Sequence, residues 1–403
     1  MVEQNPIPFT WFQNHFINDL LPYWQKSATD PNGFFYPNFD RKWQRIGNPV
    51  ATLVSQSRLL YVFSNGFFVT GDKSLRNIVD SGARFLLNHF LDEDFGGFVW
   101  ACNEKGEVTD YTKDAYGHAF VLLGLSMAFR TTGKIIFLKA AVKTYEVICA
   151  RFRDPNGSLI WKKTRDWKEL EKSRSQNPMM HAFEAFLVLN EILTSGGNSV
   201  IKKWNILAKK VKKDILEIAG FLFFPAGTRK HPWLDELYTK GWQPLPASKG
   251  GHWSVGHQFE WAYLLSMAVN QGLPEKYLRV ADDCLESALS HGFNVEKGYI
   301  YSCLDDKGMI LDKSISWWEQ SEGLRTLMHF IVCYDRTDLI KPYHSLFSFV
   351  KNSFLDPVYG GWFTSLQPDG TPLQKDKGSS WKLDYHQTGL CLEAIRLSKE
   401  TFL

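Results

Sequence analysis

The stretch Phe95-Gly96-Gly97-Phe98 returns later in the chain as Tyr359-Gly360-Gly361-Trp362, two glycines between aromatic residues. Looser versions of this turn occur at three further places, and the glycines of the whole series are Gly33, Gly96, Gly157, Gly298 and Gly360. Successive members are separated by 63, 61, 141 and 62 residues. Because the step of 141 is about twice the others, we expect a sixth, degenerate copy near residues 224–251. The 403 residues therefore divide into six units of about 67 residues each.

Between these turns, apolar residues recur at spacings of three and four, which is the pattern of helices that bury one face. The twelve predicted helices cover roughly residues 10–26, 50–71, 74–90, 111–132, 134–152, 178–194, 198–219, 253–270, 274–291, 314–334, 337–353 and 381–400. Glycines such as Gly71 and Gly133 stand where helices are expected to end. Short alternating segments after the turns, such as Phe98-Val99-Trp100, predict small β-hairpins.

A unit of this kind cannot bury its apolar faces alone, and a stack of six units would leave two open ends. Closing the units into a ring removes both ends. The sequence therefore predicts an all-α fold, an (α/α)6 toroidal barrel of six helix pairs with short β-hairpins at one mouth, and residues 1–403 as a single domain. The competing architecture is an open α-solenoid, which would bind peptides along a concave face and would not need hairpins rich in aromatic residues.

The composition is that of a globular protein, with 44% hydrophobic, 22% charged and 15% aromatic residues. No apolar run approaches the ~18 residues of a membrane span. The formal charge of +3, with both signs scattered along the chain, gives no reason to expect nucleic acid or a membrane as partner. The N-terminal residues lack the pattern of a secretory leader, and the six cysteines form no C-x-x-C pair, which favours the cytoplasm.

Polar and aromatic residues gather near the beginnings of the helices that follow the hairpins. They are Arg58, Lys113, Tyr116, Asn177, His181, Glu184, His257, Glu260, Trp317, Trp318, Glu319, Glu322, Trp381 and His386. Because alternate helices of such a ring run in the same direction, these residues are expected to converge at one mouth of the barrel.

Two histidines of this series have a glutamate three residues later. The spacing places His257 and Glu260 on one helix face, where the carboxylate can fix the tautomer of the imidazole. His181 and Glu184 have the same spacing, which is also a pattern of metal ligands in helical bundles. No H-E-x-x-H motif is present and no third ligand is fixed, so we predict neither a metal nor a cofactor.

The sequence has no P-loop, no dinucleotide-binding glycine motif and no G-x-S-x-G motif, so nucleotide chemistry and acyl transfer lack their usual residues. A pocket lined by aromatic faces and polar groups suits a sugar. A glycoside hydrolase or lyase on the same barrel would need paired carboxylic acids. Glu319 and Glu322 are three apart on one helix and cannot flank a glycosidic bond. A non-catalytic carbohydrate binder remains as the other alternative.

The chain resembles the N-acylglucosamine 2-epimerase superfamily over essentially its whole length. The resemblance rests on six segments in the order of that family, namely Ser57-Arg58-Leu59-Leu60, Lys113 to Phe120, Asn177 to Glu184, Gly256-His257-Gln258-Phe259-Glu260-Trp261, Trp317 to Glu322 and Trp381 to Gln387. It implies an (α/α)6 barrel and an isomerase of sugars. The segment after Glu260 resembles the mannose isomerase-like branch more than the N-acylglucosamine branch.

The resemblance implies that a base removes the C2 proton of an open-chain aldose to give a cis-enediolate. Return of a proton to C2 gives the 2-epimer, and return to C1 gives the ketose. His257 and His386 are then the acid and base, with Glu260 orienting His257. Arg58 and His181 would stabilise charge on O1 and O2. The sugar would be held by Tyr116, Asn177, Trp318 and Trp381, with Glu322 as a supporting carboxylate. A homodimer is the candidate assembly, and residues 224–251 are a candidate lid.

Overall fold

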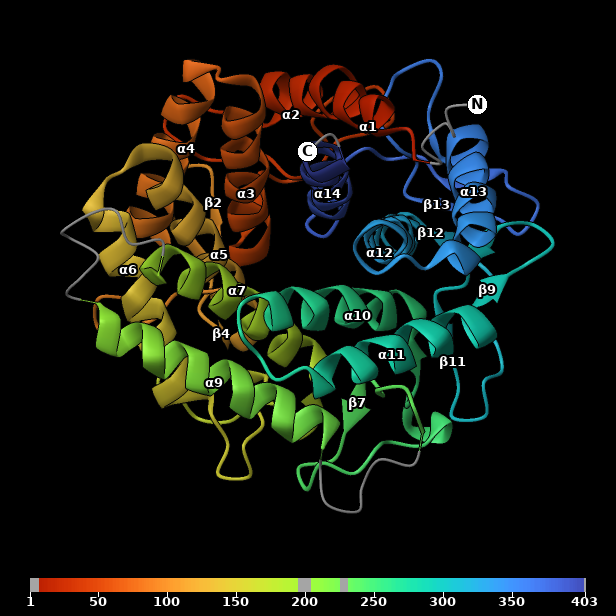
Figure 1. The fold of residues 1–403 in the computed structure, drawn as a ribbon. Helices are drawn as coiled ribbons and strands as arrows, with labels where there is room; N and C mark the ends of the chain where they lie inside the picture. The colour runs from red at the N-terminus through yellow and green to blue at the C-terminus, as the bar shows by residue number, and fades with distance from the viewer. Residues whose placement is uncertain (1–6, 195–203, 225–230, 402–403) are drawn as a thin grey trace.

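The computed structural model describes residues 7–194, 204–224 and 231–401. Within these ranges, twelve helical stretches form two concentric layers around a central axis (Figure 1). The predicted (α/α)6 barrel is confirmed. The predicted helix at 198–219 is observed at Asn205–Phe223, and its first six predicted positions lie outside the described residues.

Six helices form the inner layer. They are α3 (Leu53–Thr70), α5 (Ala115–Thr132), α7 (Gln176–Thr194), α10 (Val255–Asn270), α12 (Trp317–Tyr334) and α14 (Tyr385–Thr401). Each packs against the next, and α14 also packs against α3, so the ring is closed. This closure rules out an open solenoid.

The outer layer covers the inner one. It consists of α1 (Phe9–His15) with η1 (Phe16–Leu20) and α2 (Leu21–Ala28), α4 (Lys73–Phe85) with η2 (Leu86–Phe90), α6 (Ile135–Val147) with η3 (Ile148–Phe152), α9 (Asn205–Phe223), α11 (Lys276–Gly292), and η5 (Thr337–Leu339) with α13 (Ile340–Phe349) and η6 (Val350–Phe354). Helices α4, α6, α9, α11 and α13 each pack on the inner helix that precedes them. Helix α1 packs instead on α14, so the first and last helices complete one pair.

The inner helices begin and end where the local sequence satisfies their free backbone groups. The Thr52 side chain accepts a hydrogen bond from the backbone N–H of Ser55, whose hydroxyl accepts one from Thr52 in return, and this capping box starts α3. Helix α3 ends at Gly71 and α5 at Gly133, both with φ of 72°. This left-handed backbone costs glycine little, so both residues suit the end of a helix.

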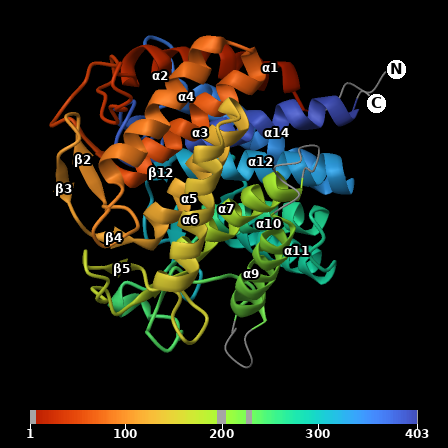
Figure 2. The same cartoon turned by 90° about the vertical axis from the view of Figure 1, so that its left-hand side faces the viewer.

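Short strands form a collar at one end of the barrel, where Figure 2 shows β2 to β5 on the side away from the end of α14. The sheets are β1 (Val50–Thr52) with β2 (Ala101–Asn103) and β3 (Val108–Asp110), β4 (Lys113–Asp114) with β5 (Lys162–Lys163), β6 (Arg174–Ser175) with β7 (Leu237–Tyr238), β8 (Trp253–Ser254) with β11 (Cys303–Leu304), β9 (Phe293–Asn294) with β10 (Tyr299–Ile300), and β12 (Ile315–Ser316) with β13 (Ser365–Leu366) and β14 (Pro372–Gln374). Five of these sheets join the strand that leads into an inner helix to a strand of the next unit along the chain. The collar therefore fixes the beginnings of α3, α5, α7, α10 and α12 relative to one another.

Buried ion pairs tie the segments that lead into two inner helices, α5 and α14, to the ends of outer helices. Asp92 follows η2 and contacts Nζ of Lys113 at 2.7 Å, and both side chains are fully buried. Asp356 follows η6 and contacts Nζ of Lys377 at 2.9 Å in the same way. The expected position of Lys113 at the mouth is therefore wrong. Its ammonium group instead neutralises the buried carboxylate of Asp92.

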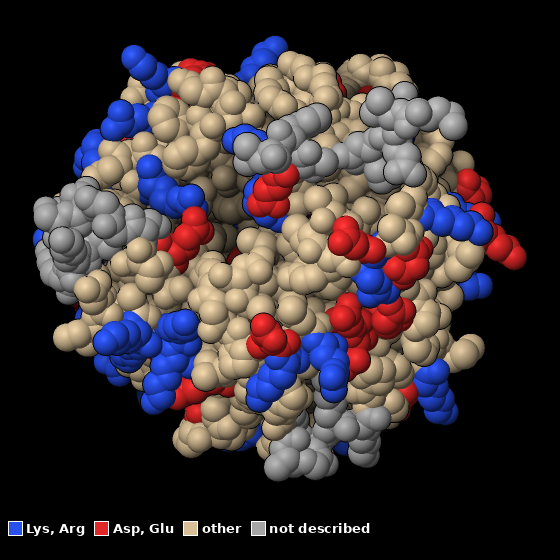
Figure 3. All heavy atoms as spheres, in the orientation of Figure 1, with Lys and Arg blue, Asp and Glu red and all other residues tan. Residues whose placement is uncertain are grey.

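The surface agrees with the composition. Figure 3, which faces the end of the barrel away from the hairpins, shows side chains of both charge signs mixed around a central hollow. None of the described helices combines the length and apolar character that crossing a membrane requires. All six cysteines are free thiols.

Candidate active site

The inner helices bring the predicted residues together at the hairpin mouth. Arg58 on α3 donates hydrogen bonds to the hydroxyl of Tyr116 on α5 and to the backbone carbonyl of Trp381, both at 2.7 Å. The ring of Tyr116 lies 5.0 Å from that of His181 on α7. Three inner helices and the segment before α14 thus contribute to one site.

Two of the predicted catalytic histidines flank one tryptophan. Ring centroids of His257 on α10 and Trp318 on α12 are 4.8 Å apart, and those of Trp318 and His386 on α14 are 5.4 Å apart. Both imidazoles are nearly buried, with 9% and 6% of their surface exposed. The two rings therefore lie close enough to act on one small ligand.

A cavity of about 430 Å³ opens beside these residues. Its lining includes Tyr116, Asn177 and Trp381 together with Trp100 and Trp161 from the hairpins. Half of the Trp381 surface is exposed, and its ring lies 6.3 Å from that of Trp100. The cavity therefore has aromatic walls and a polar floor, which is typical of carbohydrate sites.

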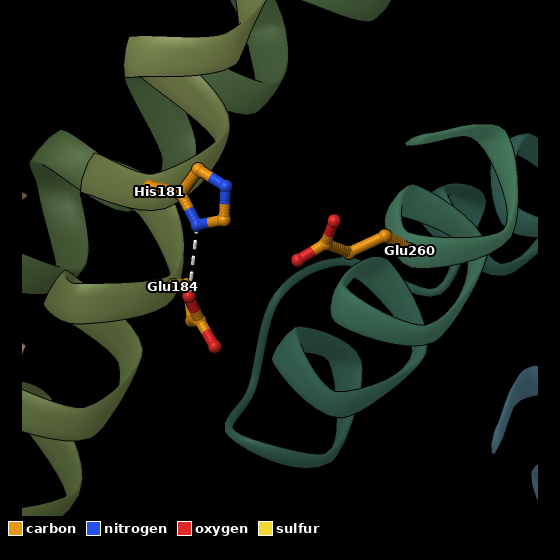
Figure 4. Close-up of side chains that lie close together, drawn as sticks. All are labelled: His181, Glu184 and Glu260. Atoms are coloured by element: carbon orange, nitrogen blue, oxygen red, sulfur yellow. Dashed lines mark hydrogen bonds and ion pairs between the residues drawn. The ribbon is translucent and has the colours of Figure 1, made fainter. Parts of the chain in front are cut away.

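The group that orients His257 is Glu236, and the predicted pairing with Glu260 is wrong. Nδ1 of His257 lies 2.5 Å from Oε1 of Glu236 and 3.1 Å from Nε2 of Gln176. Glu236 comes from the segment before β7 and reaches the imidazole from outside the ring of inner helices. Glu260 is one helical turn deeper than His257 and points toward His181 and Glu184 (Figure 4).

His386 has an equivalent partner. Its Nδ1 lies 2.7 Å from Oε1 of Glu322, which supports the predicted role of Glu322 beside the site. Burial lowers the pKa of His386 to about 4, although the hydrogen bond that His386 makes to Glu322 acts in the opposite direction. Burial alone would raise the pKa of Glu322, but Arg325 and His386 lower it overall. Near neutral pH, an uncharged imidazole therefore donates its Nδ1–H to an ionised carboxylate.

The predicted pair of His181 and Glu184 is present on α7, with Nδ1 of the histidine 3.1 Å from Oε2 of the glutamate. The hydroxyl of Tyr385 donates to the other oxygen of Glu184. Burial lowers the pKa of His181, although Glu184 acts to raise it. Burial alone would raise the pKa of Glu184, but His181 and Tyr385 lower it overall.

Glu260 lies between the two histidine–glutamate pairs and differs from both glutamates. Neither of its carboxyl oxygens has a hydrogen-bond partner among the described residues. Burial raises the pKa of Glu260 well above its usual range, and the charges of Glu322 and Glu184 raise it further. The protonated form of Glu260 is therefore favoured, and in that form it can donate an O–H to a ligand.

Among the residues that the structure describes, the same side chains form two groups that come near enough to share a cation, His181 with Glu184 and Glu260, and Glu260 with Glu322 and His386. In each group, all the donor atoms lie within 4.8 Å of one another. Each histidine is already hydrogen-bonded to the glutamate of its own group, and a protonated Glu260 is a poor metal ligand. We therefore interpret both groups as hydrogen-bonded pairs rather than as a metal centre.

The sequence did not point to three residues that shape this site, Glu236, Gln176 and Arg325. Gln176 directly precedes the segment Asn177 to Glu184, and this position next to predicted site residues could have identified it. Glu236 lies in the candidate lid, and nothing in the local pattern distinguishes it from Asp235. Within the described part of that loop, Trp233 stacks on Trp253 and Trp242 on Tyr238. Residues 225–230 lie outside the described residues, and the lid stays a prediction.

Known proteins resemble this chain over nearly its full length. The N-acylglucosamine 2-epimerase (GlcNAc 2-epimerase) family matches residues 33–389. The cellobiose 2-epimerase of Dictyoglomus turgidum is 28% identical, covering 95% of this chain and 96% of its own length. The D-mannose isomerase of Marinomonas mediterranea is 24% identical, covering 96% and 97%. Relatives named for both activities match at similar identity, so the branch within the family stays a prediction.

A solved structure agrees in fold. The cellobiose 2-epimerase from Spirochaeta thermophila superposes with a TM-score of 0.86 at 22% identity, covering 98% of this chain and 97% of that one. The match to the family extends over most of the chain and includes every residue described above at the hairpin mouth. The chain belongs to the N-acylglucosamine 2-epimerase family.

Proposed function

We propose that the protein is a sugar isomerase or 2-epimerase that removes the C2 proton of an open-chain reducing aldose and forms a cis-enediolate. The observation that supports this most is the symmetry of the two imidazoles. His257 and His386 lie on either side of Trp318, and each has its Nδ1 against a buried carboxylate.

A carboxylate at Nδ1 prepares an imidazole for proton transfer. Because an ionised carboxylate can only accept a hydrogen bond, Nδ1 has to hold the proton and Nε2 keeps its lone pair. Glu236 does this for His257 and Glu322 does it for His386. One imidazole can then take the C2 proton while the other, once protonated, returns a proton.

Several buried polar atoms at the mouth have no partner among the described residues, including Nε of Arg58, Oδ1 of Asn177 and both carboxyl oxygens of Glu260. Buried polar groups are rarely left without hydrogen bonds, so these atoms are suited to the hydroxyl and carbonyl groups of a sugar. Arg58 supplies a positive charge, and His181 lies beside it across Tyr116. These groups would stabilise the negative charge of an enediolate.

The product depends on where the proton returns. Protonation of the enediolate at C2 from the opposite face gives the 2-epimer, and protonation at C1 gives the ketose. Mannose-type chemistry is our first candidate. The tryptophans that continue the cavity outward, Trp100 and Trp161, support a disaccharide as the second candidate. An N-acylated hexosamine, as in the family's description, is the third.

The experiment is incubation of the protein with mannose, glucose, N-acetylmannosamine and cellobiose, each in D2O, followed by NMR. We expect deuterium at C2 of an epimer, or at C1 of a ketose, for at least one of these sugars. Binding of a sugar with no exchange of any C–H would contradict the proposal and favour a non-catalytic binder. Release of a monosaccharide from cellobiose would favour a hydrolase.

We further propose that the whole chain acts as one catalytic domain in the cytoplasm, on the sequence arguments given above. A homodimer is the proposed assembly, and light scattering at several protein concentrations tests it. A mass near that of one chain, 46.4 kDa, at every concentration would contradict it.

A further inference from the structure

A buried arginine that the proposed mechanism does not use lies directly beneath the site. Arg325 is on α12, one turn after Glu322, and only 8% of its surface is exposed. Its Nη1 donates to Oε2 of Glu322 at 3.4 Å, while Oε1 of the same carboxylate contacts His386. Glu322 therefore joins Arg325 to His386.

The surrounding packing is shaped to hold this guanidinium. It lies over the ring of Tyr263 on α10, with Cζ 3.7 Å from the ring centroid. On the other side, α14 has a glycine, and a Cβ at Gly389 would lie 3.2 Å from Nη1 and 3.4 Å from Cζ. Only the smallest side chain leaves room at that position without a shift of Arg325.

Arg58 and Arg325 both act on the carboxyl groups at the floor of the site. The pKa values of Glu184 and Glu322 are lowered overall, which favours their ionised forms, whereas the pKa of Glu260 is raised, which favours its protonated form. The two arginines supply positive charge beside these groups, because arginine keeps its charge in proteins. A buried charge without a counterpart is costly, so loss of Arg325 would force a proton onto one more carboxyl group.

We propose that Arg325 is a positioning residue for catalysis, whose guanidinium keeps Glu322 ionised and so holds His386 with its proton on Nδ1. This inference rests on the proposed function of His386. Arg325 acts through Glu322 and is not proposed to contact the substrate.

Loss of the guanidinium has a defined chemical consequence. Glu322 is the carboxyl group nearest to Arg325, and attraction by Arg325 is the largest influence that lowers its pKa against burial. Without it, Glu322 takes up a proton and donates that O–H to Nδ1 of His386. The imidazole then holds its proton on Nε2, and the lone pair that faces the substrate is lost.

Neighbouring inner helices place further charged or titratable groups around Arg325, Glu322 and His386. These groups are Arg58 and Tyr61 from α3, His181 and Glu184 from α7, Glu260 and Tyr263 from α10, and Tyr385 from α14. Among them, Arg58 is the only other cation that is always charged. It is occupied by Tyr116 and the carbonyl of Trp381, so it cannot replace Arg325 beside Glu322.

The test compares Arg325→Met, which removes the charge and keeps the length, with Arg325→Lys, which keeps the charge. Arg396→Met is the matched control, because this arginine pairs with Glu393 and Glu400 at the far end of the barrel. The readouts are the pH dependence of kcat and the ring ¹⁵N signals of His386, identified by their loss in His386→Asn.

In Arg325→Met, we expect the acidic limb of the kcat profile to move up by about one pH unit or more, because an opposite charge at this range lowers a carboxyl pKa by that much. At a fixed pH on that limb, kcat falls roughly tenfold while KM changes little. The ¹⁵N signals should show the proton moved from Nδ1 to Nε2. Arg325→Lys should restore most of the profile, and Arg396→Met should leave it unchanged.

If Arg325→Met does not fold, the double variant Arg325→Met with Glu322→Gln removes both charges together and restores folding. The amide oxygen introduced at position 322 can still accept a hydrogen bond from Nδ1 of His386. The ¹⁵N signals of His386 should therefore keep the wild-type tautomer across the pH range in which the imidazole is uncharged. An unchanged limb and tautomer in Arg325→Met would overturn the inference. A moved tautomer with unchanged kcat would instead overturn the role of His386, which separates the two failures.

Discussion

Nδ1 of His257 lies 2.5 Å from Oε1 of Glu236, a residue that precedes it by 21 positions and belongs to a loop rather than to the same helix. His386 repeats the arrangement with Glu322 from a neighbouring helix. The two proposed acid–base residues are thus each held by a carboxylate from another part of the chain. This relationship leads to the first two predictions.

Glu236→Ala should lower kcat on the order of a hundredfold with a smaller change in KM, because Nδ1 of His257 loses its only buried carboxylate. Glu236→Gln should recover part of the loss, since its amide oxygen can still accept the hydrogen bond. Steady-state kinetics on the sugar found active in D2O measure both. The control is Asp235→Asn, the adjacent acidic residue, which does not contact His257. Equal losses in the two positions would argue against a specific role for Glu236.

His257→Asn and His386→Asn should each reduce turnover by about two to four orders of magnitude, the usual contribution of general acid–base catalysis. Thermal stability and sugar binding should persist, because asparagine keeps a polar side chain beside Glu236 or Glu322 and no apolar side chain is removed. Deuterium exchange, melting curves and calorimetric titration test the three points. His344→Asn, an exposed histidine of α13, is the control. Wild-type turnover in either active-site variant would remove that histidine from the mechanism.

Glu319 predicts a pH dependence of stability. Burial raises its pKa to about 7 from a usual 4.5. The folded state therefore binds the proton more tightly than the unfolded state, so this contribution is full below pH 4.5 and is lost as the pH rises through 7. The difference corresponds to about 3 kcal/mol. Glu319→Gln should become more stable relative to wild type between pH 5 and pH 8.5, measured by urea unfolding. A constant difference across that range would show that Glu319 does not titrate as described.

Removal of metal should not change activity. Dialysis against EDTA should leave kcat within about twofold, because His181 and His386 are engaged by Glu184 and Glu322 and the proposed proton transfer between an imidazole and C2 of the sugar relies on general acid–base catalysis. Elemental analysis of the dialysed protein is the necessary companion measurement. If activity is lost and Zn²⁺ or Mn²⁺ restores it, the histidine–glutamate groups act as a metal centre and our interpretation is wrong.

The fold was predictable from the sequence because it depends on a repeat. Spacing of the turn glycines and of apolar residues locates every described helix of the two layers to within a few residues, except for the start of α9. The positions of Arg58, Tyr116, His181 and His386 at one mouth then follow from the parallel direction of the inner helices.

The partners within the site were less predictable. The rule for residues three apart on a helix was right for His181 with Glu184 and wrong for His257 with Glu260. Each pair lies on one face of its helix. At His257, however, Nδ1 contacts Glu236, a carboxylate from outside the helix, instead of Glu260. The expected position of Lys113 at the mouth was wrong for the same kind of reason, since Asp92 binds it from a distant turn. Local spacing cannot report a partner that tertiary structure supplies.

Helix α14 provides His386 and packs against both α12 and α3, so half of the proposed acid–base pair is seated by the same contacts that close the ring. During synthesis on the ribosome, the earlier helices emerge without the one that completes their circle. A nascent chain has to wait for its last helix before it can turn over any sugar, and a product terminated before Tyr385 would be inert whatever else of it had folded.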